Sequence, residues 1–195
     1  VMTSELITWR EFNQGYPSNK NEDFNLFDHF VVNNINEKNY YHLRGIPEEK
    51  INVLGSPRFS KKWREKYRNL LIEKTPLSQK EKMLKVVYFE HSNMYRGNEK
   101  EARETIEKLS DLDFIDLIIK PHTRSNTSEY SELVKHISTK QSFNLIKWCD
   151  VAMGVTSSIF IDVILEKKAF ILPKYFTDNS SLYQEFNVCW EVNSY

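Results

Sequence analysis

The chain has 195 residues, of which 40% are hydrophobic and 28% are charged. Lysine and arginine together number 27, as do aspartate and glutamate, so the formal net charge is zero and no overall positive field favours a nucleic-acid partner. With only 5 glycines and 6 prolines, the composition excludes collagen-like and low-complexity chains. We therefore expect an ordered protein with one sizeable core.

Signals for export or membrane insertion are not seen in the sequence. No run approaches the roughly 18 apolar residues of a transmembrane helix, and the first residues, VMTSELITWREF, lack the basic-then-apolar pattern of a signal peptide. The two cysteines, Cys149 and Cys189, lie too far apart for a metal or redox motif. We expect both thiols to be buried as small apolar groups and the protein to be cytoplasmic.

Short apolar runs bounded by turn residues predict a series of buried strands. These runs span residues 27–32, 51–55, 86–90, 116–122, 151–155, 169–174 and 186–195. Helical patterns lie between them, at residues 36–46, 59–74, 97–112, 128–137, 142–150 and 157–168. This alternation is typical of βαβ units, so we predict an α/β fold with a Rossmann-like open parallel sheet and helices on both faces.

The helix expected at residues 59–74 is amphipathic. It places Trp63, Tyr67, Leu70 and Leu71 on one stripe, with basic residues elsewhere, and we expect this stripe to pack on the sheet. Contact with a membrane surface is the alternative.

Residues 27–195 are expected to form the Rossmann-like domain, and residues 1–26 a remnant of, or link to, a further domain. Because the final run, FNVCWEVNSY, is strand-like and has no polar tail, we expect the chain to be a piece of a larger protein.

Ligands of open parallel sheets bind outside the carboxyl ends of the strands, where helix N-termini present unpaired N–H groups. The loop at residues 154–158 (GVTSS) supplies the hydroxyls of Thr156, Ser157 and Ser158 at the start of an expected helix. These residues predict an anion site, and an ordinary helix cap is the alternative.

Cationic side chains follow two of the expected strands. Lys120, His122 and Arg124 come after a buried strand, where two cations and an imidazole can hold a phosphate. In the loop at residues 55–58, Gly55 allows close backbone approach, Ser56 adds a hydroxyl, and Arg58 can reach a phosphate. The alternatives are solvated cations in the first loop and a surface ion pair of Arg58 in the second.

The loop at residues 90–93 offers Glu90, His91 and Ser92. Glu90 and His91 are the candidates for acid–base catalysis, with a positioning role as the alternative. The sequence lacks the phosphate-loop, dinucleotide-binding, zincin and nucleophile-elbow motifs. None of these four loops contains an Asp-x-Asp cluster, so we expect no metal.

Three stretches together resemble the C-terminal nucleotide-binding half of GT-B-fold glycosyltransferases. They are GI-x-x-x-KI-x-V-x-GSPR at residues 45–58, IKPH at residues 119–122 and WCDVAMGVTSSIFIDVILEKKAFILP at residues 148–173. The resemblance runs from about residue 28 to residue 176. It implies one half of a GT-B fold, with a facing N-terminal domain as its partner.

A histidine after Lys-Pro, followed later by a Ser-Ser pair, is similar to enzymes that use cytidine nucleotides. These are bacterial sialyltransferases, Kdo transferases of capsule and lipopolysaccharide assembly, and teichoic-acid glycerophosphotransferases. The resemblance implies that His122, Ser157 and Ser158 hold the donor phosphate, with Lys120 and Thr156 as neighbours. The sequence departs from the pattern in having Thr123 instead of proline after His122, and Asp162 instead of the glutamate that many relatives carry.

The implied activity is metal-independent transfer of an acidic sugar, such as Kdo or sialic acid, from a CMP-sugar to a bacterial surface polysaccharide. The nucleotide-sugar is the donor substrate and no cofactor is expected. The acceptor would be a carbohydrate or a lipid-linked glycan, reached from the cytoplasm at the inner face of the membrane through peripheral association. Further donor or acceptor contacts are expected from Gly55, Ser56, Arg58, Ser92, Arg124, Lys147 and Asp162, with cytosine near residues 143–147.

Three other functions stay open at this point. A CDP-glycerol-type transferase would move a polyol phosphate, and a UDP-GlcNAc 2-epimerase would share the fold but needs more acidic catalytic residues than these loops contain. The third is a catalytically inactive nucleotide-binding module. A catalytic acid or base on the facing N-terminal domain would lie outside residues 27–195.

Overall fold

The computed structural model describes residues 27–70, 83–91, 97–122, 130–133, 136–155, 157–177, 183 and 187–194. The chain divides into two compact units, Val1–Leu70 and Leu71–Tyr195. The division therefore falls after Leu70, whereas the sequence suggested a boundary after residue 26. Residues 1–26 lie outside the described part of the chain, and their role as a link to a further domain stays a prediction.

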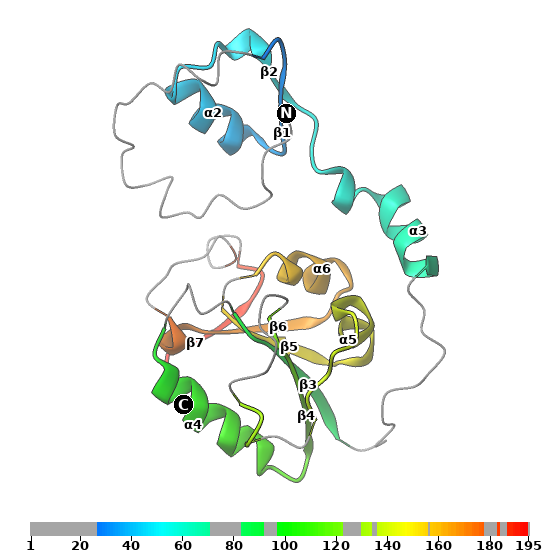
Figure 1. The fold of residues 1–195 in the computed structure, drawn as a ribbon, viewed down its shortest axis with the longest axis vertical. Coiled ribbons are helices and arrows are strands. Elements are labelled where there is room, and N and C mark those ends of the chain that lie inside the picture. The colour runs from blue at the N-terminus through cyan, green and yellow to red at the C-terminus, as the bar shows by residue number, and fades with distance from the viewer. Residues whose placement is uncertain are drawn as a thin grey trace. The chain divides into compact units, whose positions relative to one another are not determined.

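A small βαβ arrangement forms the described part of the N-terminal unit. Strands β1 (Phe30–Val32) and β2 (Ile51–Val53) pair in parallel and are connected through α2 (Ile35–Leu43) and the 3-10 turn η2 (Glu48–Lys50). They form their own two-stranded sheet (Figure 1), separate from the larger sheet of the other unit. The residues of its core are Phe30, Val32, Ile46 and Ile51.

The start of α2 is fixed by hydrogen bonds on both sides. The Glu37 N–H donates to Asn34 Oδ1 at 2.9 Å, and the buried Glu37 carboxylate accepts from the Asn33 N–H at 2.8 Å. This resembles a capping box, in which two otherwise unsatisfied donors are paired. The carboxylate of Glu37 therefore has a structural function.

The second part of this unit consists of η3 (Pro57–Phe59) and α3 (Lys61–Leu70). No residue of α3 is buried, and the Trp63 and Tyr67 rings stack on each other with centroids 6.4 Å apart. Trp63 is 45% exposed and Leu70 is 68% exposed. The expected burial of this stripe against a sheet is therefore not seen among the described residues.

A five-stranded parallel sheet organises the C-terminal unit, in the order β4-β3-β5-β6-β7 (Figure 1). Its strands are β3 (Leu84–Phe89), β4 (Ile115–Lys120), β5 (Val151–Met153), β6 (Ala169–Pro173) and β7 (Trp190–Val192). The predicted Rossmann-like parallel sheet is confirmed. The first two expected strands are not part of it, because they pair with each other in the N-terminal unit.

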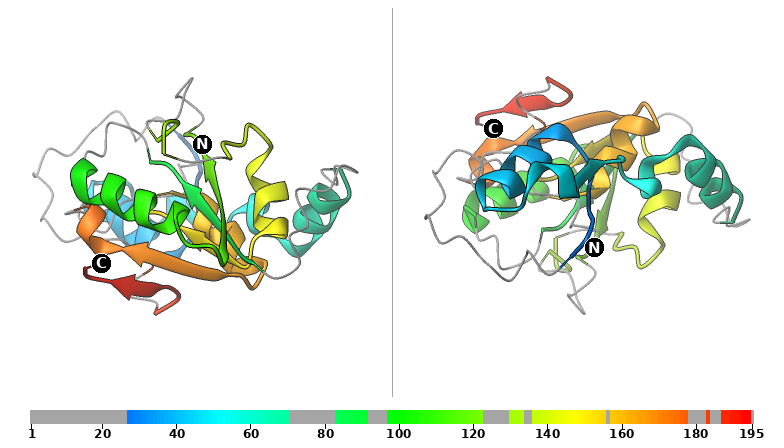
Figure 2. Two further views of the ribbon diagram at one scale, coloured as in Figure 1. Left: turned by 90° about the horizontal axis from the view of Figure 1, so that it is seen from below. Right: turned by 90° about the horizontal axis from the view of Figure 1, so that it is seen from above.

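Helices cover both faces of this sheet. Helix α4 (Glu99–Ser110) lies on one face, and α5 (Ser142–Trp148) and α6 (Ile159–Leu165) lie on the other (Figure 2). A short 3-10 turn, η5 (Lys174–Phe176), follows β6 and contacts α4. Residues 86–89 of β3 are buried without interruption, as expected for a strand covered on both faces. Cys149 and Cys189 are buried as predicted.

The helix expected at residues 128–137 is wrong over its described residues, because residues 130–133 form a turn. Instead of continuing a helix, residues 136–138 run beside β4, and the N–H of Ile119 donates to the carbonyl of His136 at 3.0 Å. The N–H of Ser138 donates back to the carbonyl of Ile119 at 2.9 Å, which completes a parallel bridge. Because β4 is the outer strand, its backbone groups need partners, and this requirement outweighs the local helical pattern.

Among the described residues, no helix combines the length and the apolar character needed to cross a membrane.

Candidate functional site

The carboxyl ends of three strands meet at one edge of the large sheet. Strand β3 lies between β4 and β5, with Phe89 opposite Lys120 and Tyr88 opposite Met153. The N–H of Glu90 donates to the carbonyl of Lys120 at 3.0 Å. The loops that follow these strands therefore begin next to one another, as the sequence predicted for three of its four candidate loops.

The loop at residues 154–158, called the serine loop below, joins β5 to α6. The Oγ of Ser157 accepts a hydrogen bond from the Ile159 N–H at 3.3 Å, so this serine caps the helix. Ser158 is the N-cap residue by position, but its side chain makes no capping hydrogen bond. The two serines are thus distinct: Ser157 fixes the helix start, and the Ser158 hydroxyl takes no part in the cap. Thr156 lies outside the described residues.

Lys120 ends β4 on the same side of the sheet as this loop. Residues paired across a parallel ladder project to the same face, and the partner of Lys120 is Phe89. The Phe89 ring contacts that of Phe160 in α6, with centroids 6.1 Å apart. The Lys120 side chain therefore leaves the strand on the face that α6 covers.

Burial lowers the pKa of the Lys120 ammonium from its ordinary value of 10.5, because the charged form loses hydration. An anion bound beside the ammonium would offset this cost through a charge-assisted hydrogen bond. His122 follows two residues later and is half-buried. The end of β4 therefore combines a partly desolvated cation with an imidazole.

Glu90 and His91 continue from β3 at the same edge. Glu90 is 8% exposed, which makes it one of the few buried charged residues in the described part of the chain, and His91 is half-buried. A carboxyl or imidazole in this position is able to accept or donate a proton. Their catalytic role stays a prediction.

Four further predicted site residues are described, in α6 and in the N-terminal unit. Asp162 is in the first turn of α6, close in sequence to the serine loop. Gly55, Ser56 and Arg58 belong to the N-terminal unit, where the Arg58 guanidinium lies 5.2 Å from the centroid of the Phe59 ring. Ser92 and Arg124 lie outside the described residues.

The structure separates Lys147 from this edge of the sheet. Lys147 is in the last turn of α5. Its carbonyl accepts a hydrogen bond at 3.3 Å from Nζ of Lys168, the residue that precedes β6. Shortly after it, the N–H of Asp150 donates to the carbonyl of Lys85 at the start of β3. Lys147 therefore lies beside the amino ends of the strands, because α5 runs antiparallel to β5, which follows it.

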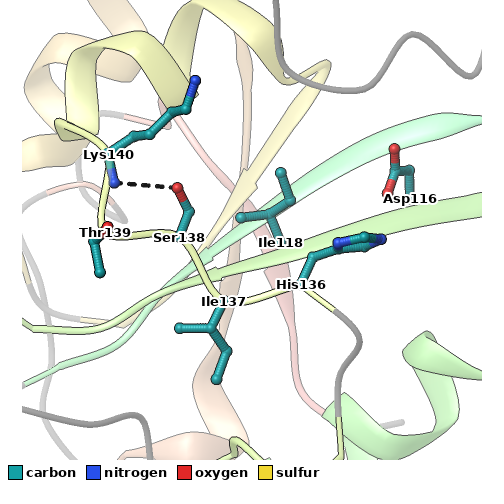
Figure 3. Close-up of a pocket in the computed structure, with 7 residues that line it drawn as sticks. All are labelled: Asp116, Ile118, His136, Ile137, Ser138, Thr139 and Lys140. Carbon is teal, nitrogen blue, oxygen red and sulfur yellow. Dashed lines mark hydrogen bonds between the residues drawn. The ribbon is translucent and has the colours of Figure 1, made fainter.

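A pocket of about 290 Å³ lies along the outer edge of β4. Figure 3 shows Asp116 and His136 at one end of it and Lys140 at the other. Its lining residues are Asp116, Ile118, His136, Ile137, Ser138, Thr139 and Lys140. None of the predicted site residues that the structure describes lines this pocket.

Sequence reasoning missed the pocket because it placed His136 and Ile137 in a helix. One signal was present: Asp116 interrupts an apolar strand and is 3% exposed, and a buried carboxylate needs polar surroundings. Among the residues that the structure describes, no group of three or more His, Cys, Asp or Glu side chains could hold a metal ion.

Comparison with known proteins supports the fold and goes no further. No protein-family model and no curated protein matches the chain. Among solved structures, the glycosyltransferase of kitacinnamycin is similar in fold, with a TM-score of 0.51 and 10% identity over 86% of this chain and 42% of that one. The wall teichoic acid polymerase TagF aligns with a TM-score of 0.46 and 17% identity over 82% of this chain and 41% of that one.

The chain thus spans about two fifths of the length of these solved structures. At 10% identity the likeness shows the fold alone. It is an α/β fold with a Rossmann-like parallel sheet.

Proposed function

We propose that this chain is the donor-binding half of a GT-B glycosyltransferase, and that it binds a cytidine nucleotide at the carboxyl edge of β3, β4 and β5. The observation that supports this most is the arrangement of two loops. Lys120 and the Ser157–Ser158 loop flank the same central strand and lie on the face covered by α6. The choice of cytosine as the nucleobase rests on the resemblance of the loop sequences to enzymes that use cytidine nucleotides.

The proposed chemistry needs positive and hydrogen-bonding groups at one point. When the bond between the sugar and CMP breaks, negative charge grows on the leaving phosphate. The Lys120 ammonium, the His122 imidazole and the Ser158 hydroxyl would bind that charge, and fixed donors of this kind lower the barrier without a metal. The donor we propose is a CMP-linked acidic sugar, such as Kdo or sialic acid.

We propose that an N-terminal GT-B domain faces this half and carries the acid or base, and that the acceptor is a surface polysaccharide or a lipid-linked glycan. The reaction would take place in the cytoplasm, at the inner face of the membrane. A CDP-glycerol donor would leave the same CMP, so turnover by the full-length protein must decide between the two donors.

Calorimetric titration tests the nucleotide. We expect CMP to bind more tightly than UMP or UDP, and an equal affinity for all three would refute the cytidine assignment. A preference for UDP would favour the epimerase alternative. CMP binding without turnover of either donor by the full-length protein would indicate an inactive module.

A pair of histidine variants tests the residues. His122→Ala should lower CMP affinity about tenfold, the lower end of what a charge-assisted hydrogen bond contributes. The matched control is His136→Ala, which removes an exposed histidine of the edge pocket and should leave the affinity unchanged. If both variants bind CMP like the parent chain, the loop after β4 is structural only.

A further inference from the structure

A cluster of aromatic rings packs against the start of α6. The Phe160 and Phe170 rings stack with centroids 3.9 Å apart, and Tyr183 meets both edge-on, at 6.0 Å and 5.4 Å. Tyr183 is only 7% exposed. Because the Tyr183 ring packs edge-on against the stacked rings of α6 and β6, the position of its hydroxyl is fixed.

That hydroxyl donates a hydrogen bond to the carbonyl of Ser157 at 2.8 Å, although the two residues are 26 positions apart in the chain. The same carbonyl accepts from the Phe160 N–H at 3.3 Å. The Tyr183 hydroxyl and the Phe160 N–H therefore both hold the Ser157 carbonyl at the start of α6. The distance between the Tyr183 hydroxyl and the Ser157 carbonyl oxygen is typical of an O–H···O hydrogen bond.

Fixing this carbonyl also fixes the next N–H group. The peptide unit between Ser157 and Ser158 is planar, and in a trans peptide the C=O and N–H point in opposite directions. None of the peptide bonds described in the structure is cis. As Tyr183 draws the Ser157 carbonyl toward the aromatic cluster, the Ser158 N–H is turned away from it.

We propose that Tyr183 is a positioning residue for the phosphate-binding loop. It holds the Ser157 carbonyl so that the Ser158 N–H and hydroxyl face the donor phosphate. The inference rests on the proposed function of this edge of the sheet. It assigns to Tyr183 a role in ligand binding that a purely packing tyrosine would not have.

Tyr183→Phe keeps the ring in the cluster and removes only the hydroxyl. The matched control is Tyr175→Phe, which removes the hydroxyl that bonds to Thr105 Oγ1 at 3.1 Å beside α4. Thermal melting of both variants confirms that they fold. The two changes remove the same chemical group, but only the first touches the serine loop.

The first measurement is amide hydrogen exchange of residues 157–160, which needs no nucleotide. We expect exchange about fivefold faster in Tyr183→Phe, the effect of losing one hydrogen bond worth about 1 kcal/mol, and no change in Tyr175→Phe. Equal exchange in the parent chain and Tyr183→Phe would overturn the inference, whatever the chain binds.

The second measurement compares CMP with cytidine, which lacks the phosphate. Tyr183→Phe should weaken CMP binding about fivefold and leave cytidine binding unchanged, because the loop contacts only the phosphate. An unchanged CMP affinity, or an equal loss for both ligands, would overturn the inference while the proposed function stands. A parent chain that binds neither CMP nor cytidine would refute the proposed function and the phosphate step with it.

Discussion

The carbonyl oxygen of Phe89 lies 2.8 Å from the point that a Cβ atom on residue 154 would occupy, and Gly154 leaves that point empty. The Cζ atom of Phe160 lies 2.6 Å from the same point. The end of β3 and the start of α6 therefore pack directly against the backbone that leaves β5. Glycine at this position is what brings the loop after β3 and the serine loop together.

Gly154→Ala should lower the free energy of unfolding by about 1–3 kcal/mol, because the added methyl group meets a backbone carbonyl and a buried ring. CMP affinity should fall as well, since the two loops must move apart. Urea denaturation and calorimetry measure the two effects. A parent-like stability would contradict the close packing.

Gly55→Ala is the contrast. A Cβ atom there meets nothing within 4 Å, but the residue has a φ of +78°, so its cost comes from backbone strain and is about 1 kcal/mol. Because Gly55 lies in the other unit, hydrogen exchange of the β3 and β5 amides should rise in Gly154→Ala and stay unchanged in Gly55→Ala.

The sequence predicted the C-terminal unit well where apolar runs are long and both faces are covered. The runs that became β3 and β4 were identified, and the helix expected at residues 97–112 was confirmed as α4. Local patterns suffice there because a continuous apolar run has few other ways to be buried. The order of strands β3, β4 and β5 then brings their loops to one edge.

Features that depend on partners distant in sequence were not predictable in this way. The pairing of β1 with β2 in a separate sheet follows from contacts between strands, and the bridge at Ile137 arises from the unpaired edge of β4. The tyrosine that bonds to Ser157 is 26 residues away from it, and no local pattern marks it. In the same way, Lys147 was assigned to the wrong edge, because sequence spacing does not show which end of α5 faces the loops.

Lys120→Met should make the chain at least as stable as the parent at pH 7 while weakening CMP binding. Burial lowers the pKa of Lys120, so between that lowered value and 10.5 the unfolded chain binds more protons than the folded one. The free energy of unfolding then rises with pH in this window. The variant should lose this rise, because methionine does not titrate.

Urea denaturation of the Lys120→Met variant and the parent at pH 7 and pH 10 measures this difference. Lys100→Met, at an exposed lysine of α4, is the control and should keep the pH dependence of the parent. The interpretation fails if Lys120→Met and Lys100→Met show the same pH dependence, or if Lys120→Met binds CMP like the parent.

Cys149 should make stability fall with pH in the alkaline range. Burial raises the pKa of its thiol from 9.0 to about 12, so above pH 9 the unfolded chain loses this proton and the folded chain keeps it. The free energy of unfolding should then decrease by up to about 1.4 kcal/mol per pH unit. Cys149→Ala should remove this part of the slope, and denaturation series from pH 8 to pH 10.5 compare the two chains. Equal slopes would contradict the buried, protonated thiol.

Lys168 connects the end of α5 to the start of β6. Its Nζ donates to the carbonyl of Cys149 at 2.7 Å and to that of Lys147 at 3.3 Å. These are carbonyls at the C-terminal end of a helix, where a cation satisfies unpaired acceptors and interacts favourably with the dipole. Lys168→Met keeps the apolar stem and removes both hydrogen bonds.

We expect Lys168→Met to lower the free energy of unfolding by about 1–2 kcal/mol, as for loss of hydrogen bonds from a charged donor. Lys167→Met is the matched control. The Lys167 side chain is exposed and should contribute almost nothing to the free energy of unfolding. Urea denaturation in low salt and in 1 M NaCl measures both. Because short, partly buried hydrogen bonds are screened less than surface charges, the difference between the variants should persist in high salt. If the two variants are equally stable, Lys168 does not hold the end of α5.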